Sequence, residues 1–199
     1  MDFSVPMAIV DFIPVILFAI GAWLLAKSLY TKMRSFEFAS FSAGCINVFF
    51  AGGLKALWKL LYALGVCDFE KLNAMFFPLQ TIGFVLAAIG LCAYVFGNNK
   101  AKMLAVATPV YSGTMLFVAL MVLGVLGINI SLCTLAVRNK KPWAVVLSVI
   151  SFVFVLGMGY LSSKDFTQAY MNWAAEIVNT VGQGCFLGCV LCIRKEIAK

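Results

Sequence analysis

Long apolar runs separated by short polar breaks occupy almost the whole chain. A helix needs about 20 mostly apolar residues to cross a bilayer, and nearly every run is at least that long. Soluble domains have about 25% charged residues, whereas this chain has 12% charged and 63% hydrophobic residues. We therefore expect an all-α polytopic integral membrane helical bundle, with residues 1–199 forming a single transmembrane domain. The expected spans are 7–30, 37–65, 74–97, 101–138, 142–162 and 168–193.

The run 101–138 is too long for one span. As a single helix it would be about 57 Å long at 1.5 Å per residue, against a hydrocarbon core of about 30 Å. Two spans of about 19 residues each fit that thickness. We therefore interpret 101–138 as a two-helix hairpin with its turn after Tyr111, which brings the total to seven spans.

The distribution of basic residues favours seven spans over six. Lysine and arginine gather in cytoplasmic loops, and seven spans with the N-terminus outside leave only Lys71 and Lys164 in outer loops. Six spans would place the basic residues of the second half outside. We therefore expect a plasma membrane protein with a cytoplasmic C-terminus, and six spans remain the alternative. The cytoplasmic basic residues would be Lys27, Lys32, Arg34, Lys100, Lys102, Arg138, Lys140, Lys141, Arg194, Lys195 and Lys199.

Four charged residues in the expected spans are candidates for charges inside the membrane, away from the cytoplasmic ends. A charge at the centre of a membrane helix costs roughly 2.5–3.5 kcal/mol, so each of them needs a partner or a function. They are Asp11, Lys55, Lys59 and Glu176. In the seven-span topology all four lie in the outer half of the bilayer, together with Gln80.

The last span carries a polar stripe. Asn172, Glu176, Asn179 and Gln183 are spaced four, three and four residues apart, which places them on one helical face. Lys55 and Lys59, four residues apart, also share a face. We expect these two faces to meet, with Asp11 and Gln80 nearby, and to form an outward-facing pocket that binds a ligand or an ion.

Three structural interpretations compete with a binding pocket. Lys59, beside Trp58 and Tyr62, can be an interfacial anchor whose ammonium extends to the headgroups. Asp11 can lie in headgroup water. Glu176 can form a purely structural ion pair with Lys55.

Small residues indicate where helices pack closely. Gly83, Ala87, Gly90 and Gly97 recur on one face of their span, and Gly184 and Gly188 are spaced four apart on the last one. Small residues at such spacings let helix backbones approach each other in a membrane. Gly52-Gly53 is a candidate kink or close crossing.

Several chemistries are not expected. The chain has no histidine, which excludes an imidazole base or a histidine metal ligand. Cys185, Cys189 and Cys192 share a helical face, but cysteine usually acts as a small apolar packing residue. The odd total of seven cysteines does not suggest a disulfide framework. We expect no catalytic residues, no metal and no cofactor.

The predicted function is a small membrane transporter or channel for a small solute. Glu176 would be the carboxylate that couples a proton or cation to transport, and Asn179 and Gln183 would bind polar groups of the solute. The alternative is a non-enzymatic receptor, sensor or assembly subunit with an outward-facing pocket. The expected partners are the lipid bilayer and a small-molecule or ion ligand, with a homo-oligomer or a partner subunit left open and no nucleic acid.

Overall fold

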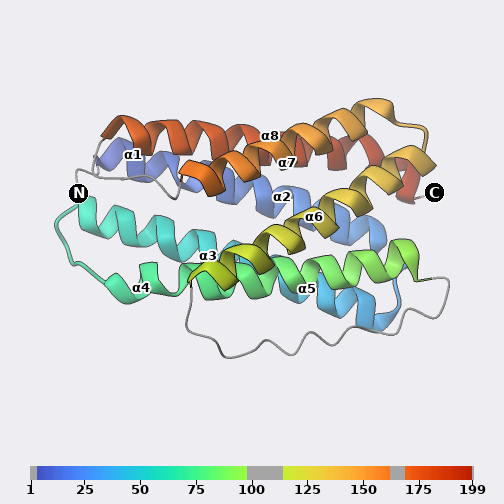
Figure 1. Cartoon of the computed structure of the whole chain (residues 1–199), viewed down its shortest axis with the longest axis horizontal. Coiled ribbons are helices and arrows are strands. Elements are labelled where there is room, and N and C mark those ends of the chain that lie inside the picture. The colour runs from blue at the N-terminus through green and yellow to red at the C-terminus, as the bar shows by residue number, and fades with distance from the viewer. Residues whose placement is uncertain (1–3, 98–113, 162–168, 199) are drawn as a thin grey trace.

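The chain is an all-helical bundle over the residues that its computed structural model describes, which are 4–97, 114–161 and 169–198 (Figure 1). No strand occurs in these three segments. The helices are α1 (Val5–Val10), α2 (Phe12–Leu29), α3 (Ser35–Ala63), α4 (Glu70–Ala74), α5 (Phe76–Phe96), α6 (Thr114–Arg138), α7 (Pro142–Leu161) and α8 (Ala169–Ala198).

Five helical stretches are long and apolar enough to cross a membrane. They are Val5–Leu29, Ser35–Ala63, Glu70–Phe96, Leu116–Arg138 and Tyr170–Ile197, and Pro142–Met158 is a shorter apolar helix. These stretches confirm the expected helical bundle with several membrane-spanning candidates. The hairpin predicted over 101–138 is described only from Thr114, where α6 begins. Its first arm lies outside the described residues, so the count of seven spans stays a prediction.

The first and third expected spans are interrupted where the prediction had continuous helices. Proline has no N–H to donate to the carbonyl four residues earlier. Pro14 therefore leaves the carbonyl of Val10 without its helical partner, and α1 ends at Val10. Pro78 has the same relation to Ala74, where α4 ends. The residues at the two breaks, Asp11 and Met75, keep right-handed helical angles, so each pair of helices forms one interrupted rod.

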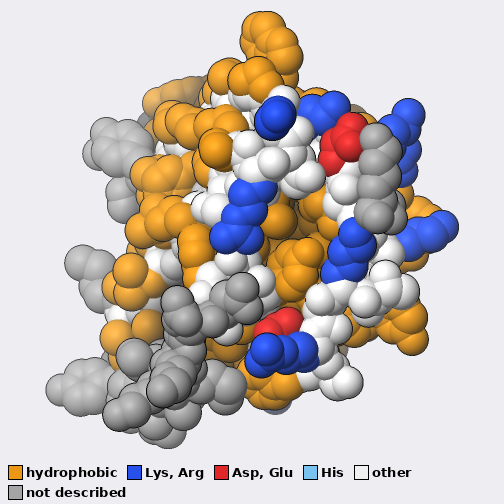
Figure 2. Space-filling model, turned by 90° about the vertical axis from the view of Figure 1, so that its right-hand side faces the viewer, with side chains coloured by type: hydrophobic (Ala, Val, Ile, Leu, Met, Phe, Trp, Pro, Cys, Tyr) orange, Lys and Arg blue, Asp and Glu red, His pale blue; other side chains and the backbone are white. Residues whose placement is uncertain are grey.

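Basic side chains gather at one end of the bundle. In Figure 1, α2, α5, α6 and α8 run toward the end that holds the C-terminus, α3 and α7 run back, and the N-terminus lies at the opposite end. Figure 2 views the bundle from the C-terminal end and shows lysine and arginine side chains around it. The helix ends and turns there carry Lys27, Lys32, Arg34, Arg138, Lys140, Lys141, Arg194 and Lys195. This one-sided distribution is the one that sets membrane orientation.

The two halves of the described bundle are built alike. Helices α2, α3 and α5 run in the same directions as α6, α7 and α8, respectively (Figure 1). Within each half, the last two helices pack on each other, α3 on α5 and α7 on α8. Between the halves, the first helix of one packs on the last helix of the other, α2 on α8 and α6 on α5. This arrangement approximates a two-fold relation about an axis along the length of the bundle.

Corresponding glycines mark this relation. A Cβ on Gly83 of α5 would lie 2.9 Å from the Gly44 oxygen and 2.8 Å from the Val48 nitrogen of α3. A Cβ on Gly182 of α8 would face the equivalent atoms of α7, 3.8 Å from the Ser151 oxygen and 3.9 Å from the Val155 nitrogen. The two helix pairs therefore cross in the same register.

The expected glycine contacts are confirmed for α5 and only partly found elsewhere. Gly83 and Gly90 lie directly against the α3 backbone, and so does Ala87, which faces Gly44. A Cβ on Gly97 would instead meet its own helix at Ala93. The close packing of α3 on α5 therefore includes Gly83, Ala87 and Gly90 but does not extend to Gly97.

On α8 only one of the two glycines expected at a helix contact, Gly184 and Gly188, faces another described helix. Gly188 faces the Leu147 side chain, but a Cβ on Gly184 would meet no atom of the described residues within 4 Å. The close crossing with α7 is at Gly182 instead. Gly52 faces Val15, whereas Gly53 faces open space among the described residues, and α3 continues through both.

We expect Gly44→Ala to destabilise the protein. Its Cβ would overlap the Ala87 backbone nitrogen and lie 2.5 Å from the Gly83 oxygen, so α3 and α5 would have to move apart. Overpacking costs about 1–3 kcal/mol, which corresponds to a melting temperature lower by about 2–12 °C. Thermal unfolding in detergent would measure this change. Gly53→Ala in the same helix is the matched control, and an equal loss in both variants would contradict the prediction.

Candidate functional site

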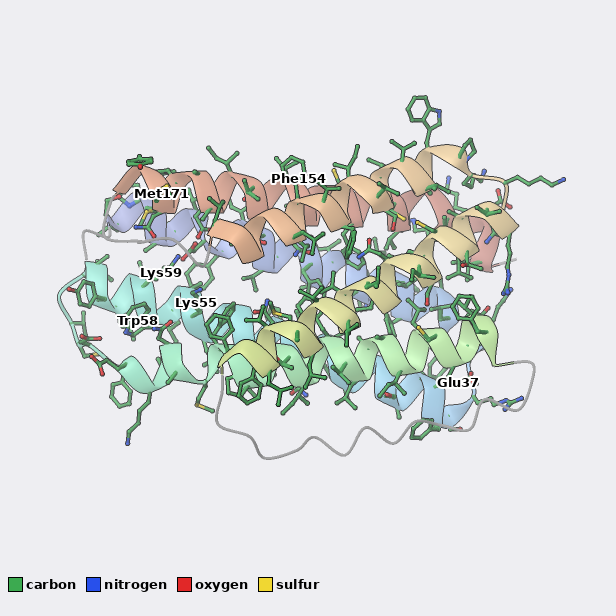
Figure 3. All side chains as sticks on the ribbon, viewed as in Figure 1. Glu37, Lys55, Trp58, Lys59, Phe154 and Met171 are labelled. Atoms are coloured by element: carbon green, nitrogen blue, oxygen red, sulfur yellow. The ribbon has the colours of Figure 1, made fainter. Side chains whose placement is uncertain are left out.

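Three charged side chains from distant parts of the chain meet in the half of the bundle that holds the N-terminus. The Lys59 ammonium lies 2.5 Å from Asp11 Oδ2 and 3.1 Å from Glu176 Oε1. All three side chains are almost fully buried, with 7–8% of their surface exposed. Figure 3 shows Lys59 on α3, with Lys55 and Trp58 nearby and Glu37 toward the opposite end.

Local structure places each member of this charged cluster. Asp11 lies at the break between α1 and α2 caused by Pro14, and its side chain makes no capping hydrogen bond to α2. It is therefore free to turn toward α3. Lys59 lies near the end of α3, and Glu176 lies near the start of α8, so the antiparallel helices bring their side chains to the same level.

The charged cluster is unevenly balanced. Two carboxylates share one ammonium, and Glu176 Oε2 is buried without a hydrogen-bond partner among the described residues. A buried carboxylate oxygen with no donor is costly. Glu176 Oε2 is therefore a position at which a proton, a cation or a donor group would be stabilised.

Lys55 supplies a second positive charge. Its ammonium lies 4.0 Å from the centre of the Phe76 ring, a cation–π contact. Within the described part of the chain, no carboxylate lies within 4.0 Å of it. When all four groups are ionised, Lys55 and Lys59 balance the charges of the two carboxylates.

Asp11, Lys55, Lys59 and Glu176 line one cavity of about 130 Å³, which we call the charged cavity. Its volume is that of roughly four water molecules at about 30 Å³ each. Aromatic rings from α2, α3 and α5 form much of the remaining wall. The residues of the predicted pocket that line it are Asp11, Lys55, Lys59, Gln80, Glu176, Asn179 and Gln183.

The remaining predicted residue, Asn172, does not line this cavity. It lies on the same α8 stripe about one turn before Glu176, and only 3% of its surface is exposed. The predicted convergence of the two polar faces is therefore found at Glu176, Asn179 and Gln183.

Two of the three competing interpretations are wrong in this structure, and the third has a different ion-pair partner. Lys59 does not extend to the headgroups, because its ammonium is held inside the bundle by two carboxylates. Asp11 is buried and paired rather than placed in headgroup water. Glu176 pairs with Lys59 and not with Lys55. Trp58 is also buried, and its Nε1 donates to Asp68 Oδ1 at 3.0 Å.

A second, smaller cavity was not predicted. It has a volume of about 30 Å³ and shares Phe18, Phe84, Val155 and Gln183 with the charged cavity. Its own lining includes the polar side chains Cys45, Asn129 and Ser151. They lie on α3, α6 and α7, so a pattern along one helix does not bring them together.

Aromatic rings lie where the two cavities share walls. The Phe18 ring stacks on Phe186 with centroids 5.6 Å apart, and it meets Phe84 edge-on at 6.4 Å. These residues come from α2, α5 and α8, so the contact joins the two halves of the bundle. The three rings form an aromatic contact between the charged cavity and the smaller one.

The cysteine face on α8 is part of the packing. Cys189 is fully buried and belongs to the hydrophobic core, whereas Cys185 and Cys192 are half-buried. Among the described residues, no group of three histidine, cysteine, aspartate or glutamate side chains is placed to hold a metal ion.

The fold and the cavity define a helical bundle of membrane type with a charged site enclosed between its helices. No protein-family model, curated protein or solved structure matches the chain. The function therefore has to be argued from the charged cavity itself.

Proposed function

We propose that this protein is a plasma membrane transporter for a small polar solute, without enzymatic activity, and that the solute binds in the charged cavity. The observation that carries this proposal is the burial of Asp11, Lys59 and Glu176 around a cavity in an apolar bundle. Ionisable residues within membrane helices are costly and typically mark a substrate or ion pathway.

The packing of the two halves supports a transport role. In transporters built from structural repeats, the substrate site lies at the interface between the repeats. Here the cavity is lined by α2, α3 and α5 of one half and by α6, α7 and α8 of the other. The proposed route continues past the aromatic contact of Phe18, Phe84 and Phe186 into the smaller cavity.

Glu176 is the proposed coupling residue. Its Oε2 lacks a partner among the described residues, so a proton and a donor group of the solute can occupy this position in turn. A solute that enters would then displace the proton, and the two would move in opposite directions. The coupling thus follows from two carboxylates that share one ammonium.

The purified protein in liposomes tests this proposal. A pH-sensitive dye enclosed in the vesicles would report proton movement, and light scattering would report solute entry. The probes would be glycine, urea, acetate and methylammonium, each added alone. Entry of at least one probe faster than into protein-free vesicles supports transport. Binding of a probe in detergent with no entry into vesicles would instead favour the receptor or sensor.

The proposed orientation makes a separate prediction. The end that carries the basic residues is expected in the cytoplasm. A topology reporter fused after Lys199 should therefore give the cytoplasmic signal. A second reporter inserted just before α4, which begins at Glu70 at the opposite end, should give the external signal. Two reporters on the same side of the membrane would contradict this orientation and the odd number of spans.

A further inference from the structure

In the charged cavity, one ammonium has no carboxylate partner and one carboxylate oxygen has no donor among the described residues, and together they define the class of solute. Lys59 is committed to both carboxylates, whereas the Lys55 ammonium has no carboxylate within 4.0 Å among the described residues. Glu176 Oε2 has no donor there either. One uncommitted positive group and one uncommitted negative atom thus line the same cavity.

We propose that the solute is a small zwitterion, which carries an ammonium and a carboxylate in one molecule. Its carboxylate would bind the Lys55 ammonium, and its ammonium would bind Glu176 Oε2. This inference rests on the proposed function, because it names the substrate class of the same cavity.

Charge balance favours a zwitterion over a simple ion. When Asp11, Glu176, Lys55 and Lys59 are all ionised, their charges cancel, so a solute with no net charge leaves the solute-bound site neutral. A simple anion or cation would leave the solute-bound site with an uncompensated charge inside the bundle, which is unfavourable. It would also satisfy only one of the two open positions.

The rest of the lining fits the same class. Gln80, Asn179 and Gln183 carry side-chain amides, which both donate and accept hydrogen bonds, so they can bind the remaining lone pairs and N–H groups. The Phe76 ring holds the Lys55 ammonium at the cavity wall. A volume of about 130 Å³ suits a molecule of the size of glycine or β-alanine.

Thermal unfolding of the detergent-purified protein tests the substrate class. Glycine and β-alanine are the zwitterionic probes, acetate and methylammonium carry one charged group each, and urea is the neutral probe. We expect the melting temperature to rise by about 5–10 °C when a zwitterion is present at 100 times its Kd. We expect no comparable rise with acetate, methylammonium or urea at the same concentration.

The Lys55→Met variant tests the proposed geometry. It removes the carboxylate-binding charge from a residue that makes no ion pair among the described residues, so the fold should persist. Its affinity for glycine should fall at least about tenfold, because a buried charged ligand group loses its partner. Lys71→Met, in α4 and outside the cavity, is the matched control and should bind glycine like the unmodified protein.

The outcomes separate the substrate class from transport. Stabilisation by acetate or methylammonium alone as large as that by glycine, or unchanged glycine binding in Lys55→Met, would overturn the zwitterion. Absence of glycine and β-alanine binding while urea enters vesicles would also overturn it, but transport would stand. Binding of glycine without entry into vesicles would support the zwitterion site and contradict transport.

Discussion

Replacing Lys59 with methionine should cause the largest loss of stability of any single substitution in the charged cavity. Methionine keeps most of the side-chain volume but removes the only ammonium that the structure places against both Asp11 and Glu176. Two carboxylates would then be buried together with no ammonium within 4.0 Å of either among the described residues. Breaking a buried ion pair by removing one partner costs about 3–5 kcal/mol, which corresponds to a melting temperature lower by about 6–20 °C.

Thermal unfolding of the purified protein in detergent would measure this loss, and two further variants separate its causes. Lys55→Met removes a lysine one turn away that has no such ion pair, so its melting temperature should change much less. A triple variant that combines Lys59→Met with Asp11→Asn and Glu176→Gln removes the three charges that form ion pairs with one another. Replacing a whole buried ionic group by neutral residues is often close to neutral for stability, so the triple variant should recover most of the loss. Equal destabilisation in the single and triple variants would show that lost packing, not charge, is the cause.

The convergence of the polar residues could be predicted because it depends on helical periodicity and on charge inside apolar runs. The spacing of Glu176, Asn179 and Gln183 fixes their common face whatever the neighbouring helices are. A polar face in an apolar helix has to point into the bundle, and the four intramembrane charges are stabilised only by meeting each other. These two arguments are enough to place the cavity residues together.

The actual partners inside the cluster could not be predicted in the same way. Lys55 and Lys59 share one face and differ by about one turn, so the choice between them depends on how α3 is shifted along its axis relative to α8. Periodicity does not reveal this shift, because the position of α3 depends on backbone contacts such as Gly44 against α5. The break at Asp11 could have been inferred from Pro14, because a proline removes the helical hydrogen bond to the residue four positions earlier.

The relation between the two halves could not be predicted because it lies in backbone contacts rather than in matching residues. Gly83 and Gly182 occupy corresponding crossings, but their neighbours differ: Gly44 in one half corresponds to Ser151 in the other. Packing tolerates any small residue at such a crossing. The smaller cavity has the same origin, because single polar residues such as Asn129 become a group only when the helices pack.

Substituting Glu176 with glutamine should abolish coupling while leaving the fold intact. The substitution leaves Asp11 and Lys59 as a one-to-one ion pair, and Lys55, which makes no ion pair among the described residues, keeps its contact with the Phe76 ring. The amide cannot take up and release a proton as a carboxylate does. In vesicles with an enclosed pH-sensitive dye, we expect the proton movement that accompanies solute addition to fall at least about tenfold, the scale on which a positioned proton-transfer group acts.

The pH dependence of solute entry separates coupling from simple loss of binding. In the unmodified protein a proton and the solute compete for Glu176, so the rate of entry should vary with pH. In Glu176→Gln any residual entry should be independent of pH, because the competing proton no longer has a site. Glu70→Gln replaces an exposed carboxylate in α4, outside the cavity, and should behave like the unmodified protein. Unaltered proton movement in Glu176→Gln would assign the coupling to another group, and Asp11, the other carboxylate bound to Lys59, would be the next residue to replace.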